Sequence, residues 1–294
     1  MQRQVNDILS RRDVLKATAA GALAAGLSYA PAFGKDSAPA APGISLQLYS
    51  IRGDCGKDFD AALQEVADMG FDAVEFAGYH KYANDPAGLR KRLDDLGLKV
   101  CGTHVGTNTL VGDALAKSIE FHQVIGCKYL IVPGDGRFWQ PEGSKELAEI
   151  FNTAAEQLKK VGMYTGYHNH KNEFKTDGGK TYWELFAERT SDDVVLQQDV
   201  GWTTEAGHDA AALVRKYPGR SKIIHCKPTL LKGDAGRPII GEDSVKWAEI
   251  ITACKEVGGT EWLTVEQERY LPDTSPMECV KLSLAGLKEI VADL

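Results

Sequence analysis

The sequence predicts an α/β fold, a single (β/α)8 TIM barrel preceded by a cleaved signal peptide. From residue 43 onward, short runs of β-branched or apolar residues alternate with longer stretches of helical periodicity, which is typical of a parallel sheet. Eight such units follow one another, and a closed barrel of about 250 residues requires eight. No Gly-rich phosphate loop follows the first strand, although an open doubly wound sheet would usually carry one there.

The first 35 residues are typical of an export signal. The string SRRDVLK at residues 10–16 precedes a run of small apolar residues at 17–32 that ends in Ala-Pro-Ala. This segment resembles a twin-arginine signal, with Val14 where phenylalanine is more usual. The resemblance implies export through the twin-arginine machinery and a periplasmic or otherwise exported location. The apolar run is too short for a stable membrane anchor.

After the signal, residues 36–42 are expected to form a flexible leader and residues 43–294 the barrel. Between the predicted strands lie helical stretches such as 58–70, 86–98, 116–127 and 145–162, and several of them are followed by the glycine expected just past a helix end. The predicted strands, in chain order, are residues 44–50, 72–77, 99–104, 128–133, 164–170, 193–199, 222–227 and 262–267.

Charge and cysteine usage exclude several classes of protein. The formal net charge is −7 and the isoelectric point is near 5.6, whereas domains that bind nucleic acid usually carry a clustered basic face. We therefore expect no nucleic-acid partner. The six cysteines are scattered without CxxC pairs, so neither a zinc ribbon nor a disulfide scaffold is predicted.

Potential ligands and acids follow most of the predicted strands. Active sites of TIM barrels lie at the C-terminal ends of the strands, where loop-initiating Gly, Ser or Asn would otherwise be expected. These strand ends carry Glu75, His104, His168 with His170, Asp199, His225 and Glu266.

Four of these residues predict a metal site. His168, Asp199, His225 and Glu266 end four successive strands, which barrel closure brings together. Two imidazoles and two carboxylates suit one divalent Mn, Zn, Co, Ni or Fe ion better than Mg or Ca. His168 and His170 have like parity in the predicted strand and so share a face. Glu173 is a loop glutamate that serves as an alternative ligand, as an acid or base above the metal, or as a solvated residue.

The strings LQLYSIR, AVEF, GYHNHKNEF, QQDVGW, IIHCKP and WLTVEQE, in this order and at strand ends, resemble the xylose isomerase-like TIM-barrel superfamily, in its sugar phosphate isomerase/epimerase group. The likeness spans residues 43–292. It implies one divalent ion held by Asp199, His225 and Glu266, together with a glutamate for which this chain has His168.

The resemblance implies a metal-dependent sugar isomerase or epimerase that works through an enediolate. The export signal favours a non-phosphorylated sugar or keto-sugar as substrate. Glu266 is then both ligand and base, His170 a second base, and Lys227 a group that polarises a substrate oxygen. Substrate contacts are expected from Glu75, His104 and Trp202.

Three alternatives remain at this point. The same enediolate leads to elimination from a 3-keto-glycoside, catalysed by a lyase or hydratase, if a β-substituent leaves. The replacement of the family's glutamate by His168 favours a non-catalytic periplasmic sugar-binding protein. A metal-dependent DNA-repair endonuclease is disfavoured by the acidic charge. The sequence is compatible with a homo-oligomer, but no stretch of it requires one.

Overall fold

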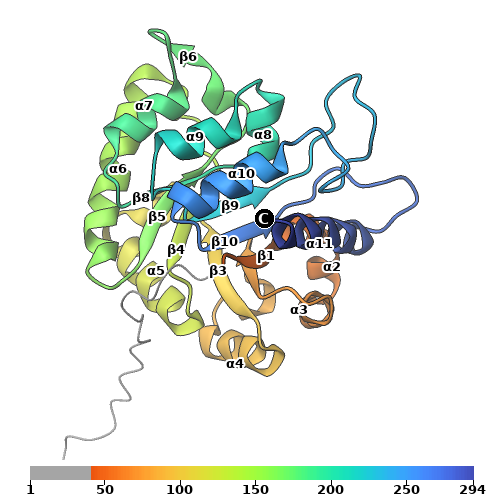
Figure 1. Cartoon of the computed structure of the whole chain (residues 1–294). Coiled ribbons are helices and arrows are strands. Elements are labelled where there is room, and N and C mark those ends of the chain that lie inside the picture. The colour runs from red at the N-terminus through yellow and green to blue at the C-terminus, as the bar shows by residue number, and fades with distance from the viewer. Residues whose placement is uncertain (1–40) are drawn as a thin grey trace, which may run out of the picture. The chain divides into compact units, whose positions relative to one another are not determined.

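The computed structural model describes residues 41–294, in which eight parallel strands form a nearly closed barrel surrounded by helices (Figure 1). The predicted α/β barrel fold is confirmed. The predicted signal peptide and most of the predicted leader lie outside the described residues. Within residues 41–294, no helix is long and apolar enough to span a membrane.

The barrel strands follow one another around the ring in chain order, interrupted only by a small hairpin of β6 (Thr176–Asp177) and β7 (Lys180–Thr181). The order of hydrogen-bonded neighbours is β8-β5-β4-β3-β2-β1-β10-β9. The barrel strands are β1 (Gly43–Gln47), β2 (Ala73–Phe76), β3 (Lys99–His104), β4 (Tyr129–Val132), β5 (Tyr164–His168), β8 (Val194–Gln197), β9 (Ile223–Cys226) and β10 (Trp262–Val265).

Among the neighbouring strands of the described barrel, β8 and β9 have the least extensive pairing. These two strands are connected by an isolated parallel bridge between Asp199 and His225. The backbone N–H of His225 donates to the carbonyl of Gln198 at 2.9 Å, next to that bridge. Two of the predicted metal ligands therefore close the ring of strands.

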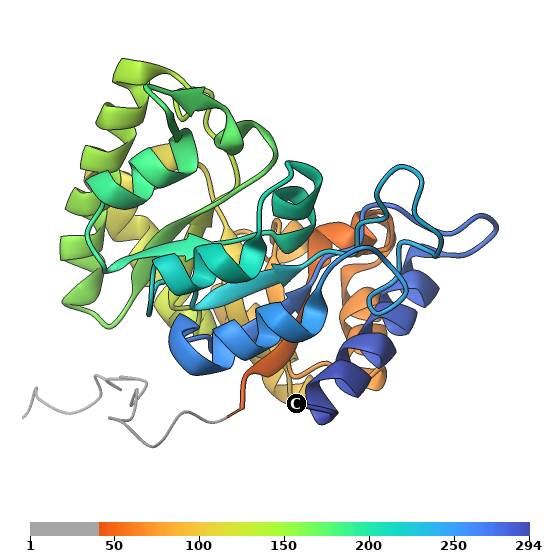
Figure 2. The same cartoon turned by 45° about the horizontal axis from the view of Figure 1, so that its top comes forward.

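Helices cover the outside of the ring (Figures 1 and 2). Many begin with a side chain that accepts a hydrogen bond from the first turn, such as Asp85 for α4, Asp199 for α8 and Ser275 for α11. The helices are α2 (Arg52–Lys57), α3 (Phe59–Asp68), α4 (Pro86–Leu96), α5 (Gly112–Ile125), α6 (Pro141–Lys159), α7 (Tyr182–Arg189), α8 (Val200–Glu205), α9 (Ala210–Lys216), α10 (Trp247–Ala253) and α11 (Pro276–Ala292).

Alternate strand residues divide between an outer apolar core and the barrel interior. Leu130, Tyr167 and Leu196 belong to a buried cluster with residues of α6 and α7, whereas Ile131 and Val195 belong to a separate small cluster. This alternation is the period of two expected for a strand. At the C-terminal ends of the strands, the residues that face the barrel interior are polar, and they form the site.

Every predicted strand except β3 ends one to three residues earlier than the sequence pattern indicated, and two of these ends have a clear cause. β1 ends at Gln47, because the Gln47 side chain accepts a hydrogen bond from the Tyr49 N–H and starts a 3-10 turn at Leu48–Ile51. β5 ends at His168, and the N–H of His170 donates to the Glu173 carboxylate rather than to a neighbouring strand. The β6–β7 hairpin was not predicted, since its strands have only two residues each.

Candidate metal centre and active site

The four predicted ligands converge at the C-terminal end of the barrel. One ligand atom from each of His168, Asp199, His225 and Glu266 lies within 4.8 Å of the others. All four side chains are buried. They come from the ends of β5, β8, β9 and β10, so the predicted convergence of four successive strands is found in the structure.

Two atoms of this cluster have no partner. The Nδ1 atom of His168 and the Oδ2 atom of Asp199 are buried and make no hydrogen bond within residues 41–294. Buried polar atoms are nearly always hydrogen-bonded, so these two require an explanation. A divalent cation would satisfy both, and the donor set of two imidazoles and two carboxylates fits such an ion.

His225 is fixed by two carboxylates. Its Nδ1 atom lies 2.9 Å from Glu266 and its Nε2 atom 2.5 Å from Glu75. Glu75 also accepts hydrogen bonds from Gln47 at 2.7 Å and from Gln197 at 2.6 Å. A carboxylate behind a ligating histidine usually orients the ring and sets its tautomer. Glu75 is fully buried and does not line the cavity, so it acts on His225 rather than on a substrate.

The pKa values in this cluster reflect the proximity of its charges. Burial alone would lower the pKa of His225, but Glu75 and Glu266 raise it to about 10. Burial alone would raise the pKa of Glu266, but the charges of Lys227 and His225 hold it well below its usual range. Burial raises the pKa of Asp199 and lowers that of His168. A bound cation therefore has to displace protons from the cluster.

Asp199 is positioned by its neighbours in sequence and by Asn169. It caps α8, because its Oδ1 atom accepts from the Trp202 N–H at 2.8 Å and leaves Oδ2 free. The Asn169 side chain accepts from the Asp199 N–H at 3.0 Å. A Cβ atom on Gly201 would lie 2.5 Å from the carbonyl oxygen of Lys227, so a glycine lets α8 approach the end of β9.

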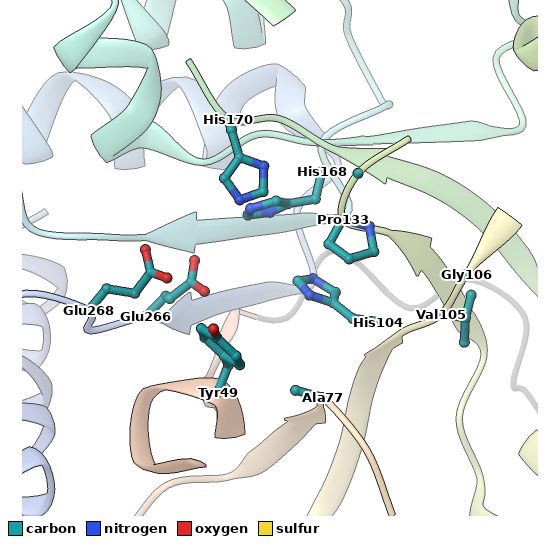
Figure 3. Close-up of a pocket in the computed structure, with 11 residues that line it drawn as sticks. Tyr49, Ala77, His104, Val105, Gly106, Pro133, His168, His170, Glu266 and Glu268 are labelled. Atoms are coloured by element: carbon teal, nitrogen blue, oxygen red, sulfur yellow. The ribbon is translucent and has the colours of Figure 1, made fainter. Parts of the chain in front are cut away.

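A cavity of about 500 Å³ opens above the cluster (Figure 3). Its floor includes His168 and Glu266, and its walls include Tyr49, His104 and His170. Burial lowers the pKa of His170 to about 4, so this imidazole is neutral near neutral pH. The predicted common side of His168 and His170 is found, with ring centroids 4.9 Å apart. Strand parity is not the reason, because β5 ends before His170.

Lys227 lies between the candidate metal cluster and an aromatic residue. Its Nζ atom is 4.0 Å from Glu266 and 4.5 Å from the ring centroid of Trp202, and it is paired with Glu268. Glu268 lines the cavity, whereas Lys227 does not. The segments that follow β9 and β10 carry these residues and lie side by side (Figures 1 and 2), joined by a hydrogen bond from Gln267 to the carbonyl of Pro238.

Two further predicted residues have other surroundings. Glu173 is buried and accepts from the His170 N–H at 2.8 Å; it is not among the residues that could hold a metal. Burial raises its pKa. His104 lines the cavity and hydrogen-bonds to Gln197 at 3.0 Å, and with His168 and His225 it forms a second group that could hold a metal ion.

Four polar residues that complete the site were not predicted from the sequence: Gln47, Asn169, Gln197 and Glu268. Gln47 and Gln197 are the last residues of β1 and β8. Glutamine at a strand end was a usable signal, since its amide donates to a buried carboxylate. Asn169 lies between the two histidines and so could have been included with them.

Comparisons with known proteins agree with this geometry. Residues 63–290 match the family described as Xylose isomerase-like TIM barrel. A curated inosose dehydratase of Serratia proteamaculans (strain 568) is 24% identical over 281 residues, which is 80% of this chain and 92% of that protein. A sugar phosphate isomerase/epimerase from Parabacteroides distasonis superposes with a TM-score of 0.71 at 26% identity, over 85% of this chain and 97% of that one.

A third similar structure is that of an IolI protein with a bound zinc atom. It superposes with a TM-score of 0.62 at 13% identity, over 85% of this chain and 98% of that one. This similarity shows a shared fold.

Proposed function

Because the chain belongs to the xylose isomerase-like TIM barrel family, we propose that it is a divalent-metal-dependent isomerase or epimerase of a non-phosphorylated keto-sugar. One observation carries this proposal: four buried ligands converge beneath a cavity, and two of their atoms lack any other partner among the described residues. His168, Asp199, His225 and Glu266 would hold the ion. The sugar phosphate isomerase/epimerase of Parabacteroides distasonis supports the reaction class.

The proposed chemistry begins with loss of a proton next to a carbonyl. A bound divalent ion would supply Lewis-acid stabilisation of negative charge on adjacent carbonyl and hydroxyl oxygens of the sugar. His170 is the proposed general base, because its neutral imidazole lines the cavity. The electron pair of the broken C–H bond forms a C=C bond, and the π pair of the carbonyl moves onto its oxygen, which gives an enediolate. Return of the proton to the former carbonyl carbon, with transfer of the hydroxyl proton between the two oxygens, gives the isomer. Return of a proton to the other face of the original carbon gives the epimer.

Other residues would position the substrate and its charge. His104 and Tyr49 line the cavity and would contact the ring. Lys227, 4.0 Å from Glu266, would keep that carboxylate ionised; because it does not line the cavity, the expected role of polarising a substrate oxygen is not part of this proposal. Glu266 is then a ligand first, with a role as second base where the reaction needs one.

Two features support a substrate without a phosphate group. The residues that line the cavity include Glu266 and Glu268 but neither Arg nor Lys, and phosphate recognition normally uses cationic side chains or backbone nests. The proposed twin-arginine signal, with Arg11-Arg12, would place the enzyme in the periplasm, away from the cytoplasmic pool of sugar phosphates.

Elimination is the second candidate. The inosose dehydratase of Serratia proteamaculans favours it, since a dehydratase removes a β-substituent after the same proton is lost. His168 in place of the family's glutamate also favours it, because a pair of glutamate bases is then not available for epimerisation. A 3-keto-glycoside is the proposed substrate in that case.

Metal analysis followed by exchange in D₂O tests the proposal. We expect near one ion per chain and metal-dependent incorporation of deuterium into keto-sugars, at the carbon that the base deprotonates. The position of the label and the product separate isomerisation, epimerisation and elimination. Metal-free protein that binds a sugar without exchange would contradict the proposal and identify a binding protein.

A further inference from the structure

A second cavity adjoins the one above the candidate metal cluster. It has a volume of about 500 Å³, within the range of small-molecule sites. Trp139 and Trp202 line it, together with Lys171 and Asn172 from the segment after β5. None of the proposed metal ligands lines this cavity, so the reaction as proposed above leaves it without a role.

The two cavities share part of their lining. Pro133, Gly134 and His170 line both of them. His170, the proposed base, therefore lies where they meet, and its ring centroid is 5.7 Å from that of Trp202. A ligand that occupied both cavities would therefore lie against His170.

The lining of the second cavity suits a sugar ring. Trp139 and Trp202 are partly exposed, and indole faces pack well against apolar surfaces such as the C–H face of a pyranose. Lys171 and Asn172 are exposed at its edge, where they can donate hydrogen bonds to hydroxyl groups. The Asn172 side chain makes no hydrogen bond within residues 41–294, so it is available to a ligand.

We propose that the second cavity binds a second sugar ring linked to the reacting ring, so that the substrate is a glycoside of two rings rather than a free monosaccharide. This inference rests on the proposed function, because it takes the ring above His168 and Glu266 as the reacting one. The second ring would be carried unchanged through isomerisation and would be the departing group in an elimination.

Binding of unreactive sugars tests the inference without turnover. Methyl cellobioside, methyl maltoside and methyl lactoside have two rings, whereas methyl glucoside and methyl galactoside have one. None of them carries a ketone, so none can lose the proton next to a carbonyl. By titration calorimetry of the metal-loaded protein, we expect at least one two-ring glycoside to bind about tenfold more tightly than the matching one-ring glycoside, as for stacking on one aromatic side chain.

Two variants test which residues provide that advantage. Trp139→Ala should remove most of the tenfold preference and leave the Kd of the one-ring glycoside unchanged. Asn172→Ala should reduce the preference as well. Because Asn172 is exposed, this substitution should not change the stability of the fold. Tyr49→Ala is the matched control, because Tyr49 lines the first cavity and not the second. This variant should raise the Kd of one-ring and two-ring glycosides by the same factor. Circular dichroism melting verifies the fold of each variant.

The outcomes separate this inference from the proposed function. Equal affinity for one-ring and two-ring glycosides, no binding of any of them, or an equal loss for both kinds in Trp139→Ala would overturn the second-ring site. Deuterium exchange into one-ring keto-sugars would leave the proposed function standing in those cases. Absence of metal-dependent exchange from every keto-sugar would overturn the proposed function, while the binding titrations still decide the second cavity.

Discussion

The Nε2 atom of His225 lies 2.5 Å from a carboxylate oxygen of Glu75, although the two residues are 150 positions apart in the chain. Both side chains are fully buried. The contact directs the other ring nitrogen of His225 toward Glu266, 2.9 Å away. Glu75 is thus a positioning residue for a proposed ligand, a role that its place at a strand end did not reveal.

Glu75→Gln should weaken the binding of a divalent ion by about 10-fold to 100-fold, the usual effect of removing a carboxylate behind a ligating histidine. Competition with a chelating dye measures this. Glu261→Gln is a suitable control, since Glu261 pairs with Tyr129 and Lys128 near the N-terminal ends of the strands. Unchanged affinity in Glu75→Gln would show that His225 needs no such support.

Asp199→Asn should abolish stoichiometric metal binding and leave the barrel folded. Asparagine keeps an oxygen that accepts from the Trp202 N–H. It lacks the carboxylate charge, and it has an NH2 group in place of the unpaired Oδ2 atom. Asp209→Asn makes the same change at the cap of α9 and should bind metal normally. Metal content by plasma emission spectroscopy compares the two. Full occupancy in Asp199→Asn would remove this residue from the ligand set.

His170→Asn should lower the rate of deuterium exchange by about 10²-fold to 10⁴-fold, the range for loss of a general base, with metal content unchanged. His80→Asn is the control, because His80 is exposed and has a φ of 48°, a conformation that asparagine tolerates. A loss of metal in His170→Asn would instead identify this residue as a ligand.

Metal binding should release protons and strengthen as the pH rises. Glu75 and Glu266 raise the pKa of His225 to about 10, so this imidazole carries a proton near neutral pH that a cation must displace. Calorimetry in two buffers with different ionisation enthalpies counts the released protons. Binding without proton release at pH 7 would contradict a role for His225 as a ligand.

Asp135→Asn should destabilise the protein by about 1 kcal/mol at neutral pH. Hydrogen bonds from Arg137 lower the pKa of Asp135 to about 2, below its value in the unfolded chain, so ionised Asp135 stabilises the fold above about pH 4. This contribution should disappear as the pH falls from about 4 to about 2. Urea unfolding at several pH values measures it, and a difference that is constant with pH would exclude the ionic contribution.

The strand pattern predicted the barrel well, because parallel strands are buried on both faces and their apolar runs are bounded by clear helices. β3 begins and ends where predicted, at Lys99 and His104. All other predicted strands end one to three residues early, and two of these errors have a visible cause: Gln47 and Glu173 accept hydrogen bonds from backbone N–H groups that a longer strand would have used. Such local competition is decided by tertiary placement, which one sequence does not display.

The convergence of the candidate ligands was predictable for a similar reason. Residues at the ends of neighbouring strands meet regardless of loop lengths, so His168, Asp199 and Glu266 could be grouped in advance. The role of Glu75 and the second cavity could not, because each depends on how side chains from distant segments fill the space above the barrel. Trp139, for example, lies in a loop whose path the residue pattern leaves undefined.

The bridge between Asp199 and His225 also bears on how the ring of strands assembles. Since these two proposed ligands join β8 to β9, an ion bound by both side chains would stabilise the pairing of these two strands. Metal binding and closure of the ring of strands would then be thermodynamically linked. Backbone amides of β8 and β9 would exchange with solvent faster in the metal-stripped protein than those of β3 and β4, so the architecture itself would report whether the ion is present.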